Sequence, residues 1–190
     1  MFSFKKFYFL IIQNTRDINI DDIKKYNKFI IIYRNKENKE NISDLIKFRK
    51  RCKLKSIKFF IANNFGLASS VRSDGIYLSA HNKSLKSLNY KRNNFEVIGS
   101  AHNYNEISQK RKQGCKNIFL SRIFLVSYKT KQSFLGINKF NNHSLVFKGI
   151  IPLGGINFTT LNKLKMVKCE GFAILSEIKK KPAKIISRLF

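Results

Sequence analysis

Tryptophan is absent from this sequence of 190 residues, and proline and glycine are scarce. With two prolines and nine glycines, no Pro/Gly-rich linker marks a boundary between domains. The length suits one hydrophobic core, and a hydrophobic fraction of 43% is enough to build that core without disulfides. We therefore expect residues 1–190 to form a single domain.

Cysteine is also rare. Cys52, Cys115 and Cys169 lie far apart, are odd in number and form no CxxC pair. This pattern excludes a disulfide framework and argues against a zinc site built from cysteines. Unpaired thiols are typical of a reducing compartment, so we expect a cytoplasmic protein.

Long hydrophobic runs are missing, and no stretch approaches the length needed to span a membrane. The first residues, MFSFKKFYFLII, place two lysines before a short apolar run, as signal peptides do. The run is too short for a signal sequence, and no small-residue cleavage site follows it. We interpret it as the first β-strand and expect no membrane association.

Acidic residues are few: 11 Asp and Glu stand against 38 Lys and Arg, giving a formal charge of +27. Such a surface suits nucleic acid. The basic residues are dispersed, however, and no zinc-finger, RNP or bZIP pattern accompanies them. The abundance of Lys, Asn, Ile and Phe is what an AT-rich coding sequence produces. We expect anionic small molecules, not nucleic acid, as the partners.

Eight short apolar runs recur along the chain, each followed by a segment with helical features. The runs cover residues 6–12, 29–34, 57–63, 75–80, 95–101, 117–124, 149–156 and 171–177. They are mostly continuous in apolar residues, as in strands of a parallel sheet buried on both faces. Helices are indicated over 41–53, 103–113, 157–165 and 182–189, and more weakly over 136–147.

Eight strand–helix units predict an α/β protein, a compact single-domain (β/α)8 TIM barrel. The alternative is an open, doubly wound sheet, but no GxGxxG motif opens the first unit. In a barrel the chemistry lies at the carboxyl ends of the strands, so the residues there are the candidate site.

The tetrapeptide SAHN occurs twice, at residues 79–82 and 100–103, each time between an apolar run and a polar, helix-like stretch. A two-histidine metal site, a tandem repeat, or two neighbouring strand ends facing one pocket would each explain it. The barrel favours the third explanation. A zinc pair of His81 and His102 would lack an obvious third ligand, so we expect supporting hydrogen bonds from them.

Two groups at the strand ends suggest anion binding. Gly154-Gly155 near the end of the seventh run and Ser176 near the end of the eighth stand where barrels often bind phosphate, although the glycines could simply turn the chain. Across the mouth, Arg34, Lys36 and Lys129 suggest a second anionic group, although a lysine in so basic a chain is often only solvated.

No Ser-His-Asp order, catalytic Cys-His pair or close carboxylate pair is evident. This disfavours a reaction that needs a strong protein base. A reaction with a diphosphate leaving group fits better, because positioning and charge stabilisation do most of the catalysis there.

Several stretches, in this order, resemble the family of thiamine-phosphate synthases and thiazole tautomerases: YRNK, FIANN, DGIYL, IGSAHN, GGIN and GFAILSEI, within residues 29–178. The resemblance implies a barrel transferase that joins hydroxymethylpyrimidine diphosphate to thiazole phosphate in thiamine biosynthesis. Diphosphate leaves, a pyrimidine-methyl cation forms, and the thiazole nitrogen attacks it. The alternative is a non-catalytic barrel that binds thiamine-precursor phosphates.

The resemblance also implies roles for individual residues, and Arg34, Lys129 and Ser100 are the expected catalytic residues. Arg34, Lys36 and Lys129 match diphosphate-binding positions. Asn63 matches the pyrimidine pocket, and Ser100 contacts the pyrimidine diphosphate. The thiazole-phosphate site corresponds to Gly155, Leu175 and Ser176.

The sequence departs from the family at informative positions. Asn64 and Asn82 replace two aspartates that hold Mg²⁺, and amides attract a hard cation less than carboxylates do. We expect Mg²⁺ to arrive mainly on the substrate's diphosphate, with these two amides as weaker ligands. Arg122 replaces the tautomerase histidine, which argues against tautomerase activity. Further departures are Ile32 for a glutamine, and Val126 and Tyr128 for two threonines.

Overall fold

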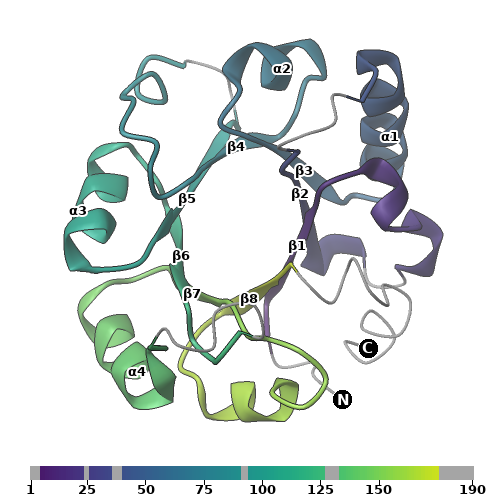
Figure 1. Cartoon of the computed structure of the whole chain (residues 1–190). Coiled ribbons are helices and arrows are strands. Elements are labelled where there is room, and N and C mark those ends of the chain that lie inside the picture. The colour runs from purple at the N-terminus through teal and green to yellow at the C-terminus, as the bar shows by residue number, and fades with distance from the viewer. Residues whose placement is uncertain (1–4, 24–25, 36–39, 91–93, 127–132, 176–190) are drawn as a thin grey trace.

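Eight parallel strands close into a barrel in which each strand pairs with its neighbours in chain order and the eighth pairs with the first (Figure 1). This computed structural model describes residues 5–23, 26–35, 40–90, 94–126 and 133–175. The strands are β1 (Phe7–Ile12), β2 (Phe29–Tyr33), β3 (Lys58–Ala62), β4 (Gly75–Leu78), β5 (Glu96–Ala101), β6 (Asn117–Ser121), β7 (Ile150–Leu153) and β8 (Gly171–Ile174). The predicted barrel is confirmed, and each strand lies within its predicted apolar run.

Two hydrophobic clusters explain why the runs are continuous rather than alternating. Alternate side chains such as Phe9, Ile32 and Phe119 fill the inside of the ring. The residues between them, such as Leu10 and Ile31, pack outward against the helices. Both strand faces are therefore buried, as in other parallel sheets.

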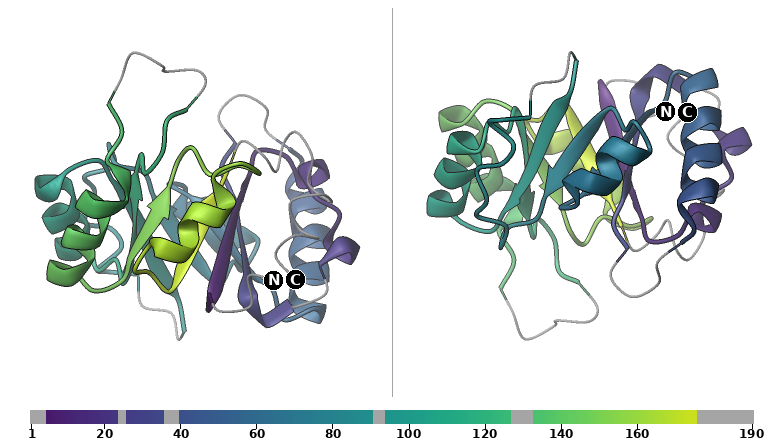
Figure 2. Two further views of the ribbon diagram at one scale, coloured as in Figure 1. Left: turned by 90° about the horizontal axis from the view of Figure 1, so that it is seen from below. Right: turned by 90° about the horizontal axis from the view of Figure 1, so that it is seen from above.

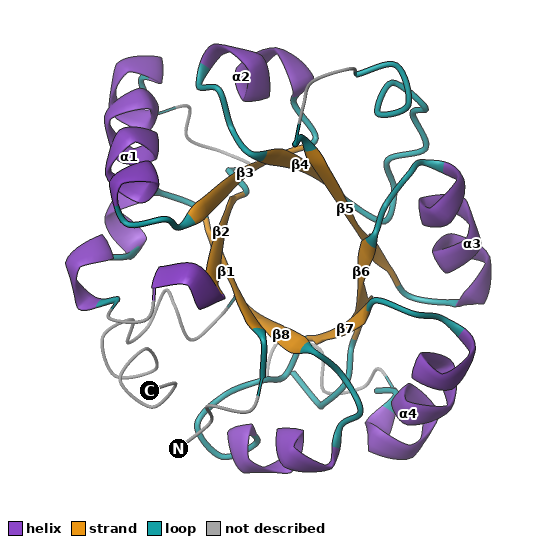
Figure 3. Cartoon of the chain, turned by 180° about the vertical axis from the view of Figure 1, so that it is seen from behind, coloured by secondary structure: helices purple, strands orange, loops and turns teal. Residues whose placement is uncertain are grey.

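The helices lie outside the ring of strands (Figures 1 and 3). The α-helices are α1 (Ile42–Leu54), α2 (Phe65–Ser70), α3 (Tyr104–Lys112) and α4 (Gly136–Val146), and the described 3₁₀ helices are η1 (Thr15–Asp17), η2 (Ile20–Asp22), η3 (Tyr26–Lys28) and η5 (Leu161–Met166). The expected N-caps are present: the side chains of Asn41 and Asn103 accept backbone N–H bonds at the starts of α1 and α3. None of the helices in the described residues is long and apolar enough to cross a membrane.

Two helix predictions need correction, and one lies outside the described residues. The stretch after the first SAHN, residues 79–90, forms turns instead of a helix (Figure 3). The buried side chains of Lys110 on α3 and of Gln113, which caps the end of α3, donate to the Asn82 carbonyl, and Gln113 also donates to the Ser84 carbonyl. These carbonyls accept bonds from α3 rather than from a helix of their own. The segment predicted over 157–165 is 3₁₀ instead of α, and 182–189 is not described.

Side-chain bonds also join the segments that precede the first and last strands. Lys5 donates from Nζ to the carbonyl oxygens of Val167 at 2.8 Å and of Cys169 at 3.0 Å. Lys6 pairs with Glu170 at 2.8 Å. Both lysines lie just before β1 and their partners just before β8, so side-chain bonds reinforce the closing strand pair. The side views in Figure 2 show the helices and loops around this ring.

Candidate active site at the barrel mouth

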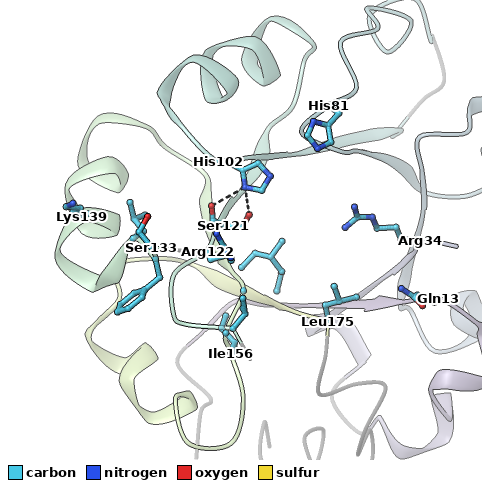
Figure 4. A pocket seen from close by; sticks show the side chains of 17 residues that line it. Gln13, Arg34, His81, His102, Ser121, Arg122, Ser133, Lys139, Ile156 and Leu175 are labelled. Carbon is cyan, nitrogen blue, oxygen red and sulfur yellow. Dashed lines mark hydrogen bonds between the residues drawn. The ribbon is translucent and has the colours of Figure 1, made fainter. Parts of the chain in front are cut away.

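A cavity of about 850 Å³ opens at the carboxyl ends of the strands (Figure 4). Its charged and polar lining residues include Gln13, Arg34, His81, His102, Arg122 and Lys139. No carboxylate is among the described residues that line it, whereas three permanent cations are. The mouth is therefore built to attract anions.

Arg34 reaches the mouth because of its position in the strand direction of β2. It lies two residues beyond Ile32, which faces the inside of the ring, so its side chain points the same way. Its guanidinium carbon lies 5.9 Å from the centre of the Tyr77 ring, a cation–π arrangement. The backbone N–H of Arg34 also bonds to the carbonyl of Ile12 at 2.8 Å. Packing thus holds this cation before any ligand binds.

Ser100 belongs to the buried carboxyl-terminal half of β5. It is 6% exposed, is not a lining residue, and its side chain hydrogen-bonds Tyr77. Burial raises the pKa of Tyr77, and the charge of Arg34 and the hydrogen bond from Ser100 oppose that rise. Tyr77 is therefore a neutral phenol that connects Ser100 to Arg34.

Asn63 joins the ends of β3 and β4. Its backbone has φ of 59°, a left-handed conformation that asparagine tolerates better than most residues. The Asn63 Oδ1 accepts the backbone N–H of Ser79 at 2.9 Å and the Nδ2 of Asn82 at 3.1 Å. These bonds fix the side-chain oxygen of Asn63 within the protein.

The oxygens of Asn64 and Asn82 are likewise engaged. The Asn64 Oδ1 caps α2 by accepting the Leu67 N–H at 2.9 Å, and the Asn82 Oδ1 accepts the Ser84 N–H at 3.0 Å. The described residues contain no cluster of three His, Cys, Asp or Glu side chains able to hold a metal. Mg²⁺ binds proteins chiefly through carboxylates in near-octahedral geometry, and two neutral amides already bonded to the backbone do not fit this ion.

The two SAHN segments meet at the mouth. The rings of His81 and His102 are 6.5 Å apart, centre to centre, at the ends of adjacent strands. His102 Nδ1 lies 2.9 Å from Ser121 Oγ and 3.3 Å from the Ser121 carbonyl, on the next strand (Figure 4). The segments are thus neighbouring strand ends facing one cavity, and the bonds to Ser121 orient the His102 ring.

On the opposite side, Gly155 and Leu175 line the cavity beside the ends of β7 and β8. Gly155 has φ of 70°, and a Cβ there would lie 2.5 Å from the Phe124 carbonyl oxygen. Only glycine fits this turn, so the turning role is established independently of any ligand. Three further predicted site residues, Lys36, Lys129 and Ser176, lie outside the described residues.

The cavity also contains residues that the sequence did not single out as ligand contacts. Gln13 follows β1 at the spacing of Phe9 and Ile11, both of which face inward, so this alternation could have identified it. Lys139 belongs to α4, so a prediction based on strand ends could not identify it. Arg122, which argues against tautomerase activity, follows the end of β6 and lines the cavity across from Arg34 (Figure 4), as its strand-end position predicts.

Solved structures share this architecture. The chain superimposes on thiamine phosphate pyrophosphorylase from Pyrococcus furiosus with a TM-score of 0.70 at 15% identity, covering 99% of this chain and 98% of that one. It superimposes on KGPDC from Streptococcus mutans with a TM-score of 0.62 at 11% identity, covering 98% and 99%. At these identities the likeness concerns the barrel fold alone.

Sequence comparison identifies the family. A thiamine-phosphate synthase of Prochlorococcus marinus is 29% identical over 155 residues, covering 78% of this chain and 44% of that protein. The enzyme of Methanococcus vannielii is 24% identical over 121 residues, covering 63% and 59%. The chain thus spans less than half of the Prochlorococcus relative and under two thirds of the Methanococcus one. The model of the thiamine monophosphate synthase family matches residues 19–178, and the chain belongs to that family.

Proposed function

We propose that this protein is a thiamine-phosphate synthase, a transferase that joins hydroxymethylpyrimidine diphosphate to thiazole phosphate and releases diphosphate. The observation that carries the proposal is the cationic cavity, lined by Arg34, Arg122 and Lys139, at the mouth of a barrel of this family. Both substrates are anionic, and the described lining bears no opposing carboxylate. The unpaired thiols of the sequence suit a reducing compartment, so we place the reaction in the cytoplasm.

The proposed chemistry needs positive charge more than it needs a base. The bond between the pyrimidine methylene carbon and the diphosphate oxygen breaks, and its electron pair leaves with the diphosphate. The thiazole nitrogen then donates its lone pair to the methylene cation and forms the new C–N bond. No proton is transferred in either step, so fixed cations beside the leaving group supply the main stabilisation.

Arg34 is the described residue best suited to the leaving group. A guanidinium can bind two phosphate oxygens at once, and the Tyr77 ring beneath it limits its motion. We assign the Asn63 side chain to the pyrimidine on the basis of the family pattern. Ser79 and Asn82 occupy its oxygen and it does not line the cavity, so only its Nδ2 is left to donate to the pyrimidine. We assign the thiazole phosphate to the side of Gly155 and Leu175.

Lys36, Lys129 and Ser176 complete the proposed set on the basis of the family pattern alone. We keep Lys129 as a proposed catalytic residue, and we propose Ser100 as a positioning residue that acts through Tyr77. We derive no step through Mg²⁺, because the oxygens of Asn64 and Asn82 do not make a fitting site.

The test is direct. The purified chain is incubated with both substrates, and thiamine phosphate and diphosphate are quantified by mass spectrometry. We expect equal amounts of the two products, and none when either substrate is omitted. If both substrates bind but no thiamine phosphate forms, the chain is a binding protein for these phosphates and the proposed catalysis is wrong.

A further inference from the structure

We propose that this protein binds diphosphate with side-chain cations and without a protein-held divalent metal ion. In this proposal, the side-chain amides of Asn64 and Asn82 have a structural role: their hydrogen bonds fix the segments that follow β3 and β4. The inference rests on the proposed function for the identity of the ligand, but it concerns how the diphosphate charge is balanced. Three observations support it.

The first observation concerns Asn82, whose amide nitrogen has a specific task. Its Nδ2 donates to the Asn63 Oδ1, which already accepts the N–H of Ser79. Aspartate at position 82 has no hydrogen to donate and would place a carboxylate oxygen against the Asn63 oxygen. The asparagine is therefore matched to its neighbour, and a metal-binding carboxylate is not.

The second observation is that the segment carrying Asn82 is anchored from below by a buried cation. Lys110 is fully buried and donates from Nζ to the Asn82 carbonyl at 2.6 Å, and Gln113 Nε2 donates to the same oxygen at 2.9 Å. The aliphatic part of Lys110 fits there because Gly99 on β5 has no side chain: a Cβ at Gly99 would lie 2.8 Å from Lys110 Cδ. Protein groups thus fix the position of Asn82 without a metal ion.

The third observation is the charge around the cavity. Among the described residues near the mouth, Asp17, Glu40 and Glu106 each accept backbone N–H bonds, and none lines the cavity. The family's two aspartates together with one divalent ion carry no net charge, and two asparagines carry none either. Arg34 then meets the diphosphate directly, and Arg122 and Lys139 add positive charge to the lining of the cavity.

The experiment measures the coupling between Mg²⁺ and inorganic diphosphate by calorimetry on the full chain. We expect the diphosphate Kd in excess Mg²⁺ to be no tighter than in EDTA, within about threefold, because no protein site links the two ligands. Titration of Mg²⁺ alone should give no binding heat. A Kd that becomes tenfold tighter or more with Mg²⁺ would overturn the proposal.

The variant N64D/N82D restores both carboxylates. We expect its diphosphate affinity to fall in EDTA and to recover about tenfold or more in Mg²⁺. N89D/N142D adds the same two charges at exposed asparagines outside the cavity lining and should show no such recovery. Since N82D breaks the bond to Asn63, N64D is measured as well: aspartate can also cap α2, so this variant should fold normally and gain part of the coupling.

The outcomes separate this inference from the proposed function. Failure of diphosphate to bind with or without Mg²⁺ contradicts the proposed substrate site itself. Tight binding that requires Mg²⁺ contradicts only the metal-free recognition. Absence of coupling in both the wild type and N64D/N82D contradicts the assignment of the lost metal site to these two positions.

Discussion

At the scale of single residues, Arg34 illustrates how strand alternation places a charge. Ile30 and Ile32 on the same side of β2 are buried in the ring, and the next inward position extends past the hydrophobic layer into the mouth. The Arg34 guanidinium therefore lies over buried apolar and aromatic side chains, of which Tyr77 is one. Its loss should affect ligand binding and not the core.

We expect Arg34→Ala to lower kcat/KM for thiamine phosphate formation by at least about a hundredfold, because charge-assisted bonds to the leaving group are lost. The melting temperature should stay near that of the wild type. The control is Arg72→Ala. This exposed arginine precedes β4 and so lies at the end of the barrel opposite the mouth, and its replacement should leave activity unchanged. Wild-type turnover in Arg34→Ala would remove this residue from the site.

Two thiols give the protein a predictable response to alkali. Burial raises the pKa of Cys52 and that of Cys115 from 9.0 to about 12. In the unfolded chain the thiols ionise at their ordinary pKa, whereas in the folded protein they remain neutral. Their stabilising contribution is therefore complete below about pH 9 and is lost as the pH rises towards about 12.

We expect the free energy of unfolding, measured with urea, to fall above about pH 9 by up to about 1.4 kcal/mol per pH unit for each thiol. Cys52→Ala should be less stable at neutral pH because of the cavity it creates, but its pH slope should be shallower. Iodoacetamide should label Cys52 and Cys115 at roughly pH 8 only after unfolding. Rapid labelling of the native protein would contradict their burial.

At the scale of elements, the contact between α3 and the β4–β5 connection is the least conventional part of the barrel. Where most such barrels have a helix, residues 79–90 form turns whose carbonyls accept bonds from Lys110 and Gln113. The Ser87 hydroxyl also donates to the Gln113 carbonyl at 2.7 Å. The carboxyl end of α3 therefore holds the described part of this connection, together with the bonds from Asn63 to Ser79 and Asn82.

We expect Lys110→Met to keep the barrel but to loosen this connection. The Asn82 carbonyl keeps its bond from Gln113 Nε2 but loses the one from Lys110, and the buried Gln113 Oε1 loses its donor, at a cost of about 1–3 kcal/mol. Hydrogen exchange followed by mass spectrometry should show faster exchange over residues 79–90, while β5 and β6 remain protected. Lys112→Met, at the exposed neighbouring lysine, is the matched control and should change neither. Unaltered exchange in Lys110→Met would show that the other contacts suffice.

The strands could be predicted from the sequence more completely than the helices, because the strands are buried on both faces. Runs such as residues 29–34 are apolar on both faces, which leaves few alternatives to a buried strand. The turns after β4 depend on Lys110, which lies 28 residues away from Asn82, and local patterns do not report such a partner. Likewise Leu161 and Leu164, three residues apart, fit an α-helix and a 3₁₀ helix equally well.

The site was predictable where a role depends on strand position and not where it depends on a partner. Arg34, Gly155 and Leu175 line the cavity, as their places at strand ends indicate. Asn63 and Ser100 are turned to protein partners, Asn82 and Tyr77, that come near only when adjacent strands pair. Lys139 was missed because it reaches the mouth from a helix.

At the scale of the whole molecule, the effect of the +27 charge on ligand binding depends on how the basic residues are distributed. Basic side chains are spread over the chain, and the cationic lining of the mouth is a small part of them. Dispersed charge attracts polyanions without orienting them, so it produces weak and non-specific association.

We expect affinity for duplex DNA to be independent of sequence and to fall by about a thousandfold or more between 50 and 200 mM salt. Fluorescence anisotropy with two unrelated duplexes at several salt concentrations measures both properties. Nanomolar binding that survives at 200 mM salt, or a preference for one duplex, would contradict our exclusion of nucleic acid as a partner.

The closure between β1 and β8 has a consequence for biosynthesis. Phe7 pairs with Gly171, and Lys5 bonds to Val167, so the contact between β1 and β8 joins segments more than 160 positions apart in the sequence. A nascent chain on the ribosome therefore exposes two unpaired, apolar strand edges until nearly all of these residues have been made. During that interval the growing polypeptide is most vulnerable to aggregation, and a chaperone that shields open sheet edges would help it most.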